Sequence, residues 1–204
     1  MCIRDRYNGL YFTGYITDFR FVKGSSVHTS NFTVPTERLT AITNTSLLAC
    51  HLPYFADGST NDHTITVNGD TKIEPFSPYD YLQYDAGTDG GSVYIDGAAG
   101  NYLTVPPGTD FAMGTGDFTF EFWMYHTGYS SYYYGDTHGL VYSQDVINTN
   151  WFNIGTGNPT TRKINLQYGT GGGGSALYSG GTWTPNAWHH VAVVRNSGLS
   201  LIHI

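Results

Sequence analysis

Apolar and polar residues alternate with a period of two along much of the chain. The clearest stretch has Phe118, Phe120, Phe122 and Met124 at alternate positions. Side chains two residues apart on a strand point to the same face, so this set is predicted to face the core. Further strands are predicted at residues 14–22, 46–51, 64–67, 92–96, 102–105, 140–143, 151–154, 163–168, 176–178 and 188–195. No comparable stretch has the 3.6-residue period of a long helix.

Turn-forming residues separate these stretches. Asn68-Gly69, between Thr-Val and Asp-Thr-Lys-Ile, predicts a tight hairpin. Residues 169–174 fit G-x-G-x-x-G, but strand-like Ser-Ala-Leu-Tyr follows, which favours a hairpin connection over a phosphate-binding loop. Residues 128–139 contain four tyrosines and are predicted to form an exposed loop. Short helical turns fit near residues 109–113 and 185–187. Many short strands with regular turns predict an all-β sandwich or barrel.

Composition excludes several classes of protein. The net charge of −7 argues against nucleic-acid binding, which needs clustered Lys and Arg. Aromatic residues make up 16% of the chain, enough apolar surface to argue against disorder. No run approaches the 18 apolar residues or so of a membrane-spanning helix.

Both ends of the chain resemble translated sequencing-adapter sequence. Residues 1–6 read Met-Cys-Ile-Arg-Asp-Arg, and residues 199–204 read Leu-Ser-Leu-Ile-His-Ile. The alternative is a charged N-terminal tail and an apolar final strand. We expect the adapter origin and set both hexapeptides aside from reasoning about the fold. Cys50 is then the single native cysteine, expected to be a small buried hydrophobe.

Several segments follow one another in a familiar order. They are Gly-Ser-Val-Tyr-Ile-Asp-Gly at 91–97, Asn-Tyr-Leu-Thr-Val at 101–105, Phe-Ala-Met-Gly-Thr-Gly-Asp-Phe-Thr-Phe-Glu-Phe-Trp at 111–123 and Trp-His-His-Val-Ala-Val-Val-Arg at 188–195. This order resembles the laminin-G-like branch of the concanavalin A-like lectin-glucanase jelly rolls. It is similar to tandem copies in virion proteins of marine phages and in secreted proteins of marine bacteria. The resemblance implies an antiparallel β-sandwich jelly roll.

Residues 14–24 resemble the last strand of such a domain, yet they precede the motifs that open one. We therefore interpret residues 7–43 as the C-terminal tail of a preceding copy. Residues 44–198 form a jelly roll that is truncated at its C-terminus. A truncated sandwich exposes an edge and part of its core. We expect residues 14–22 to fill the vacant final-strand position in cis, beside residues 118–123.

Catalytic chemistry has little support in the sequence. Glycosidases of this fold use paired carboxylates, and the nearest pair is Asp117 and Glu121, with no third acid following. Glu121 is expected to be a satisfied or solvent-facing strand residue. His189 and His190 are neighbours on a strand and point to opposite faces, so they are not expected to share a metal ion. The expectation is that the protein is not an enzyme.

Aromatic side chains are the main candidates for ligand binding. The candidate ligand-binding residues are Tyr129, Tyr132, Tyr133, Tyr134 and Trp151. Aromatic rings stack on sugar faces, and a tyrosine-rich loop suits a protein partner equally well. Trp151 and Trp183 are weaker candidates than the tyrosines, because Trp in a sandwich more often belongs to the core.

Calcium is the one cofactor that the resemblance implies, although none is certain. Calcium takes oxygen ligands, and loop carboxylates supply them. The loop acids are Asp57, Asp62, Asp85, Asp89 and Asp136, of which Asp85 and Asp89 are the candidate metal ligands. Each of these residues is more often a turn-former or a solubilising surface charge.

The resemblance predicts a non-catalytic recognition module within a multidomain adhesive or phage virion protein, located outside the cell or on the virion. Its expected partners are a glycan or a host-surface protein, together with further copies of the same domain in the parent chain. No nucleic acid and no membrane span are expected. The alternatives are a structural spacer or protein-interaction domain and, less favoured, a degenerate glycoside hydrolase.

Overall fold

The computed structural model describes residues 1–3, 12–79, 85, 90–128, 138–144, 150–157, 160–170 and 173–204. Strands dominate this part of the chain, and its one helical element is the short 3-10 turn η1 (Thr109–Phe111), where a turn was predicted. Within these residues, no helix has the length and apolar character needed to cross a membrane.

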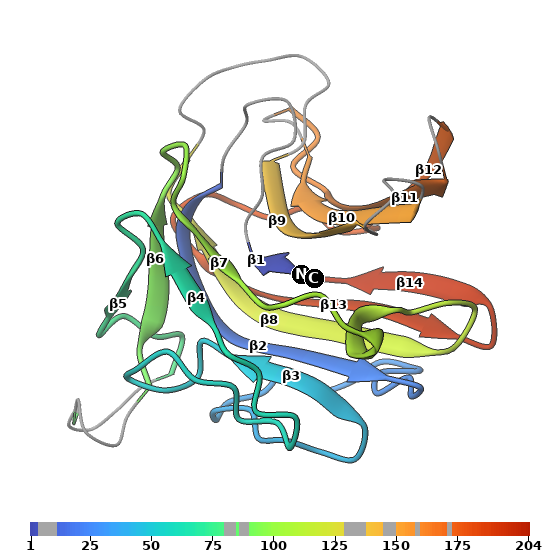
Figure 1. Ribbon diagram of the computed structural model, residues 1–204. Coiled ribbons are helices and arrows are strands. Elements are labelled where there is room, and N and C mark those ends of the chain that lie inside the picture. Colours follow the sequence, from blue (N-terminus) through green and yellow to red (C-terminus); the bar gives the residue numbers. More distant parts are fainter. Residues whose placement is uncertain are drawn as a thin grey trace.

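Two antiparallel sheets pack face to face (Figure 1). Sheet I has the strand order β12 (Gly173–Tyr178), β11 (Ile164–Thr170), β10 (Asn150–Thr156), β9 (His138–Gln144), β1 (Cys2–Ile3), β7 (Tyr102–Thr104) and β4 (Thr66–Asn68). Sheet II has the order β14 (Leu199–His203), β13 (Trp188–Asn196), β8 (Phe118–His126), β2 (Thr13–Lys23), β6 (Ser92–Asp96) and β5 (Lys72–Glu74), and β3 (Thr45–Ala49) also pairs with β2. The predicted all-β antiparallel sandwich is confirmed.

The core lies between the two sheets. Phe118, Phe120, Phe122 and Met124 of β8 are at most 2% exposed, which confirms the face predicted from their alternation. Phe21 of β2 stacks on Phe120 with ring centroids 4.1 Å apart. Sheet I closes the core from the other side with side chains that include Leu140, Ile154 and Leu166.

Strand β2 is central in sheet II. One edge pairs with β8, in a register that places Tyr15 opposite Tyr125 and Phe21 opposite Phe120. The other edge is divided, because residues 13–16 pair with β6 and residues 19–22 pair with β3. This is the position expected of a strand that completes the sandwich in cis. The division of the chain into parts of two copies stays a prediction.

The turn at Asn68-Gly69 is present, but the predicted hairpin is wrong. Strand β4, before the turn, pairs with β7 in sheet I, whereas β5, after it, pairs with β6 in sheet II. The Oδ1 atom of Asn101 accepts the Asp70 N–H at 2.9 Å and fixes the turn from outside. The connection therefore crosses between the sheets, and each short strand covers the edge of a different sheet.

The other predicted hairpin is confirmed, since β11 and β12 pair antiparallel across residues 171–172. The two terminal hexapeptides both contribute strands: β1 lies between β7 and β9, and β14 pairs with β13. Ile3 of β1 is fully buried. The assignment of both hexapeptides to adapter sequence stays a prediction.

Candidate functional site

Trp151 lies on the outer face of sheet I. Its neighbour Phe152 belongs to the core, so alternation turns the indole away from the core. Trp151 pairs with Gly169 of β11, and Gly169 pairs with Gly174 of β12. A Cβ atom added to Gly174 would lie 2.9 Å from Cζ2 of Trp151, so the indole reaches across β11 to the edge strand. Gly169 and Gly174, paired on neighbouring strands, leave room for the ring to lie across the sheet.

Polar groups lie beside this ring on the same face, two residues further along β10 and β11. Asn153 and Gln167 are paired on the same outer face, and the Nδ2 atom of Asn153 donates to Oε1 of Gln167 at 3.3 Å. Asn153 is fully buried, whereas Gln167 is partly exposed. The buried amide therefore orients the exposed one. The amide nitrogen of Gln167 is a donor, and it makes no hydrogen bond to the described part of the chain.

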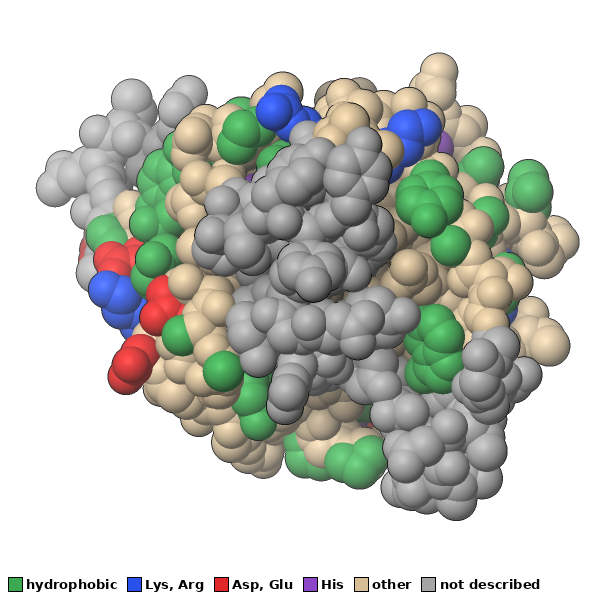
Figure 2. All heavy atoms as spheres, turned by 90° about the horizontal axis from the view of Figure 1, so that it is seen from above, with side chains coloured by type: hydrophobic (Ala, Val, Ile, Leu, Met, Phe, Trp, Pro, Cys, Tyr) green, Lys and Arg blue, Asp and Glu red, His purple; other side chains and the backbone are tan. Residues whose placement is uncertain are grey.

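Tyr178 of β12 completes the row at its other end. It pairs with Asn165, which points outward because Ile164 and Leu166 on either side belong to the core. Tyr178 is 57% exposed. Gly174, Ser175 and Ala176 of the same strand are small and exposed, so nothing bulky on β12 separates the tyrosine from Trp151. Figure 2 looks down on this side of the molecule and shows exposed hydrophobic side chains around the undescribed atoms.

Of the predicted ligand-binding residues, Trp151 is the one that the structure describes. Tyr129, Tyr132, Tyr133 and Tyr134 lie outside the described residues, so their role stays a prediction. The core assignment favoured for both Trp residues fits Trp183, which is completely buried, but not Trp151, which is partly exposed and lies outside the core. Alternation in the sequence would have placed Gln167 and Tyr178 on outward positions. Their alignment with Trp151 depends on the register of three strands, which alternation does not give.

The structure adds no geometric support for the predicted calcium site. Asp85 is exposed, and Asp89 lies outside the described residues. Asp57 serves the turn instead: its Oδ1 atom accepts the backbone N–H groups of Leu48 and Ser59, and its Oδ2 atom accepts Ser59 Oγ–H and the His63 N–H. Among the described residues, no group of three or more His, Cys, Asp or Glu side chains could hold a metal ion.

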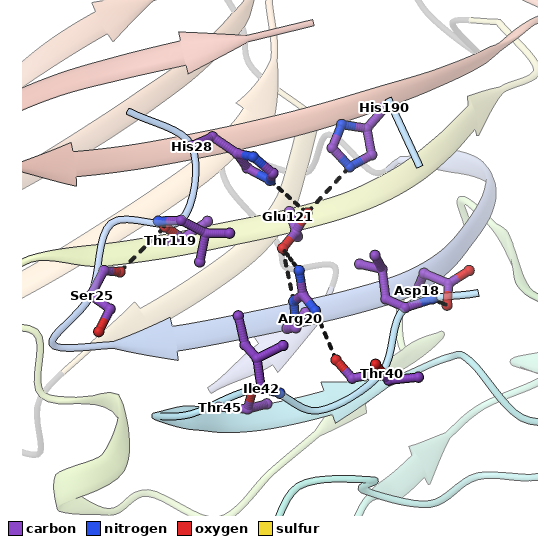
Figure 3. Close-up of polar contacts among 12 residues, drawn as sticks. Asp18, Arg20, Ser25, His28, Thr40, Ile42, Thr45, Thr119, Glu121 and His190 are labelled. Atoms are coloured by element: carbon purple, nitrogen blue, oxygen red, sulfur yellow. Dashed lines mark hydrogen bonds and ion pairs between the residues drawn. The ribbon is translucent and has the colours of Figure 1, made fainter. Parts of the chain in front are cut away.

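Glu121 lies in a buried charge network on the outer face of sheet II (Figure 3). Arg20 donates to Oε1 from Nε at 2.8 Å and also from Nη2. His28 and His190 place Nε2 at 2.9 and 3.5 Å from Oε2. Glu121 is fully buried, because residues 24–44 cover this face and Arg20 Nη1 also donates to the Thr40 carbonyl.

The network determines the ionisation of Glu121. Burial alone would raise the pKa of its carboxyl, but the hydrogen bonds from His190 and His28 and the Arg20 charge outweigh burial. The pKa is held well below its usual range, so Glu121 is a buried anion paired within sheet II. Asp117, the other acid of the weighed catalytic pair, accepts the Ser197 N–H at 2.8 Å. The satisfied strand glutamate is therefore the correct description of Glu121.

The side chains of His189 and His190 point to opposite faces of β13, as alternation predicts. His190 is buried beside Glu121 and packs edge-on against Trp123, with ring centroids 5.4 Å apart. His189 instead places Nε2 at 3.0 Å from the Thr184 backbone nitrogen.

Comparisons with known proteins give one match. No curated protein and no solved structure matches the chain significantly. A laminin G family model, described as the concanavalin A-like lectin/glucanases superfamily, matches residues 96–204, which is more than half of the chain. The matched region contains β8 to β14, and with them the outer face that carries Trp151. The two-sheet antiparallel fold and this match together show that the chain belongs to the concanavalin A-like lectin/glucanase superfamily.

Proposed function

We propose that the protein is a non-catalytic recognition module that binds carbohydrate on the outer face of β10, β11 and β12. The observation that carries the proposal is the Trp151 indole lying across β11, with Gln167 beside it and Tyr178 further along. An aromatic face packs against the C–H groups of a pyranose ring, and an oriented amide donates to its hydroxyls. Binding sites commonly combine apolar surface with a few placed polar groups in this way.

The lectin side of the superfamily is favoured over the glucanase side. Glycoside hydrolysis needs two carboxylates that reach the scissile bond. Glu121 has no exposed surface, and both of its oxygens are occupied by protein groups. We expect no glycan turnover, and we expect replacement of Glu121 to change stability and not a hydrolytic rate.

A glycan array probed with the purified protein tests the proposal. Trp151→Ala should weaken any observed binding by about tenfold or more, because a central Trp at a binding surface contributes on this scale. Gly174→Ala should also weaken binding, since the added methyl would meet the indole at 2.9 Å and displace it.

Gly180→Ala is the matched control, because an added Cβ there has no atom within 4 Å. It should leave binding unchanged. Binding that survives Trp151→Ala would move the site elsewhere, with Tyr129 and Tyr132–Tyr134 as the next residues to replace. Absence of binding to every glycan would favour the structural spacer or the protein-interaction domain.

We also propose a setting for this module: a multidomain adhesive or virion protein, acting outside the cell or on the virion. The support is the resemblance of residues 14–24 to the last strand of a preceding copy. Sequencing the parent gene beyond both ends tests this setting. It should reveal further copies of the domain, and a gene that encodes a single copy would contradict it.

A further inference from the structure

We infer that the ligand is an uncharged glycan chain that lies along β11, contacts Trp151 and Tyr178 at its two ends, and binds without calcium. This inference rests on the proposed carbohydrate-binding function and adds the ligand's charge, extent and metal requirement. Its three supports are the charge of sheet I, the spacing of the two aromatic residues and the amide between them.

The first support is a charge difference between the sheets. None of the seven strands of sheet I contains Lys, Arg, Asp or Glu. The strands of sheet II contain Asp18, Arg20, Lys23, Lys72, Glu74, Asp96, Glu121 and Arg195. The charged side chains visible in Figure 2 lie toward the top and left of the view. The face that carries Trp151 is therefore built from neutral strands.

Neutral strands select against two kinds of ligand. Sulfated, phosphorylated or uronic-acid glycans are recognised by Arg and Lys, which form strong charge-assisted hydrogen bonds. Calcium-bridged sugars need carboxylate oxygens on the protein. Arg162 and Lys163 directly precede β11, at the hairpin end where Asn165 pairs with Tyr178, so the cations near the row lie at its Tyr178 end and not beside Trp151. The strands themselves supply neither a cation for an anionic glycan nor a carboxylate for calcium.

The second support is the spacing of the two aromatic residues. Trp151 pairs with Gly169, and Tyr178 pairs with Asn165, four residues earlier on β11. At about 3.4 Å per residue, the two pairs are about 14 Å apart along the strand. Gln167 lies midway, about 7 Å from each. One sugar unit does not reach both aromatic residues, so the arrangement fits an oligosaccharide that contacts the exposed amide between them.

The third support is that Gln167 is oriented before any ligand binds. The Asn153 amide donates to its Oε1 atom, so the donor nitrogen of Gln167 is the part left to meet a ligand. A hydroxyl group of a neutral sugar accepts from such a donor without bringing charge to the sheet. Binding then loses less side-chain entropy than it would at a freely rotating amide.

The test measures binding of the intact protein by calorimetry to neutral and anionic probes. The neutral probes are glucan, mannan and galactan oligosaccharides of increasing length. The anionic probes are alginate and heparin oligosaccharides, and each titration is repeated with EDTA. We expect a neutral series to bind, with affinity rising about tenfold or more from the monosaccharide to the longer chains. EDTA and raised ionic strength should leave that affinity unchanged.

Two variants test whether the rise in affinity with chain length comes from Tyr178. Tyr178→Ala should reduce the affinity for the longer chains about tenfold while leaving the monosaccharide affinity unchanged. Tyr54→Ala is the matched control, because Tyr54 is 58% exposed and Tyr178 is 57% exposed. Tyr54→Ala should change neither affinity.

The outcomes separate this inference from the function on which it rests. Binding confined to anionic glycans, or lost with EDTA, overturns the inference while carbohydrate binding stands. Equal affinity for short and long neutral chains overturns the two-ended arrangement. Failure of both probe sets to bind overturns carbohydrate binding itself, and the inference with it.

Discussion

Asp18 is a buried acid whose charge destabilises the fold at neutral pH. It is fully buried at a bulge in β2 and has a positive φ of 52°. Burial raises the pKa of its carboxyl to about 6, against the lowering effects of Tyr79, the Leu39 N–H, Arg38 and Thr17. Because the folded state binds this proton more tightly than the unfolded chain, this group's contribution to stability falls as pH rises from about 4 to 6.

We predict that Asp18→Asn raises stability at pH 7 and removes this part of the pH dependence. A rise in pKa from 3.8 to about 6 corresponds to roughly 3 kcal/mol, which is the upper limit of the gain. Asn suits the positive φ, and its carbonyl can still accept the Leu39 N–H. Its amide nitrogen would take the place of Oδ2, which accepts from the hydroxyls of Tyr79 and Thr17, and a hydroxyl can accept as well as donate. Urea unfolding at pH 5 and pH 7 measures the effect. A variant that is less stable than the parent at pH 7 would contradict the prediction.

Asp57→Asn is the control, because it makes the same change at another buried acid. Each oxygen of Asp57 accepts a backbone N–H, which cannot accept in return, so an amide nitrogen at either position would face a donor. This variant should lose about 1–3 kcal/mol at both pH values. Opposite signs for the two substitutions would show that the gain at Asp18 comes from its charge and not from amide chemistry in general.

At the residue scale, the sequence predicts which side chains are buried better than it predicts which residues they contact. Alternation identified the core face of β8 and placed Glu121 on the opposite face. It could not show that residues 24–44 fold over that face and bury Glu121 against Arg20, which is 101 positions away in sequence. Contacts of this kind depend on which strands become neighbours, and that information is not local.

Gly14 determines how closely the central strands of sheet II approach. A Cβ atom added there would lie 2.0 Å from the backbone oxygen of Tyr125 on β8. Because a backbone atom cannot rotate away, Gly14→Ala must separate β2 from β8. We expect a loss of about 3 kcal/mol or more and a fall in Tm of about 6–12 °C.

Thermal unfolding followed by circular dichroism measures the effect of Gly14→Ala. Gly116→Ala is the control, because its added methyl would have a single neighbour, the Met113 carbonyl oxygen at 3.7 Å. The control should unfold within about 1 °C of the parent, since a surface change of this kind costs little. Similar Tm values for both variants would mean that β2 and β8 are not held at this distance.

Elements themselves are easier to predict than their partners. The segments that became β2, β6, β8 and β13 were all predicted as strands, because alternation is a property of each segment alone. The Asn68-Gly69 turn was also correct, yet its flanking strands joined different sheets. Turn chemistry determines where the chain bends, whereas pairing is decided by which sheet edge each strand can cover. The row formed by Trp151, Gln167 and Tyr178 was missed for the same reason.

At the scale of the whole molecule, the N-terminal segment holds sheet II together. β2 is the common neighbour of β8 on one side and of β6 and β3 on the other. Phe12, Ile16, Phe19 and Phe21 from this segment are at most 1% exposed. Burying four such side chains contributes about 6–12 kcal/mol, which is comparable with the whole stability of a typical domain.

We therefore predict that a chain lacking residues 1–44 does not fold cooperatively, although it keeps all of the strands from β3 to β14. Calorimetry should show no unfolding transition, because sheet II is then divided between β8 and β6, and sheet I also loses β1 between β9 and β7. A synthetic peptide of residues 1–44, added in excess, should restore the transition by filling both vacant positions in trans. A peptide of the same composition in scrambled order should not restore it. A full-sized transition in the truncated chain alone would show that β2 is dispensable, and that the remaining strands close sheet II without it.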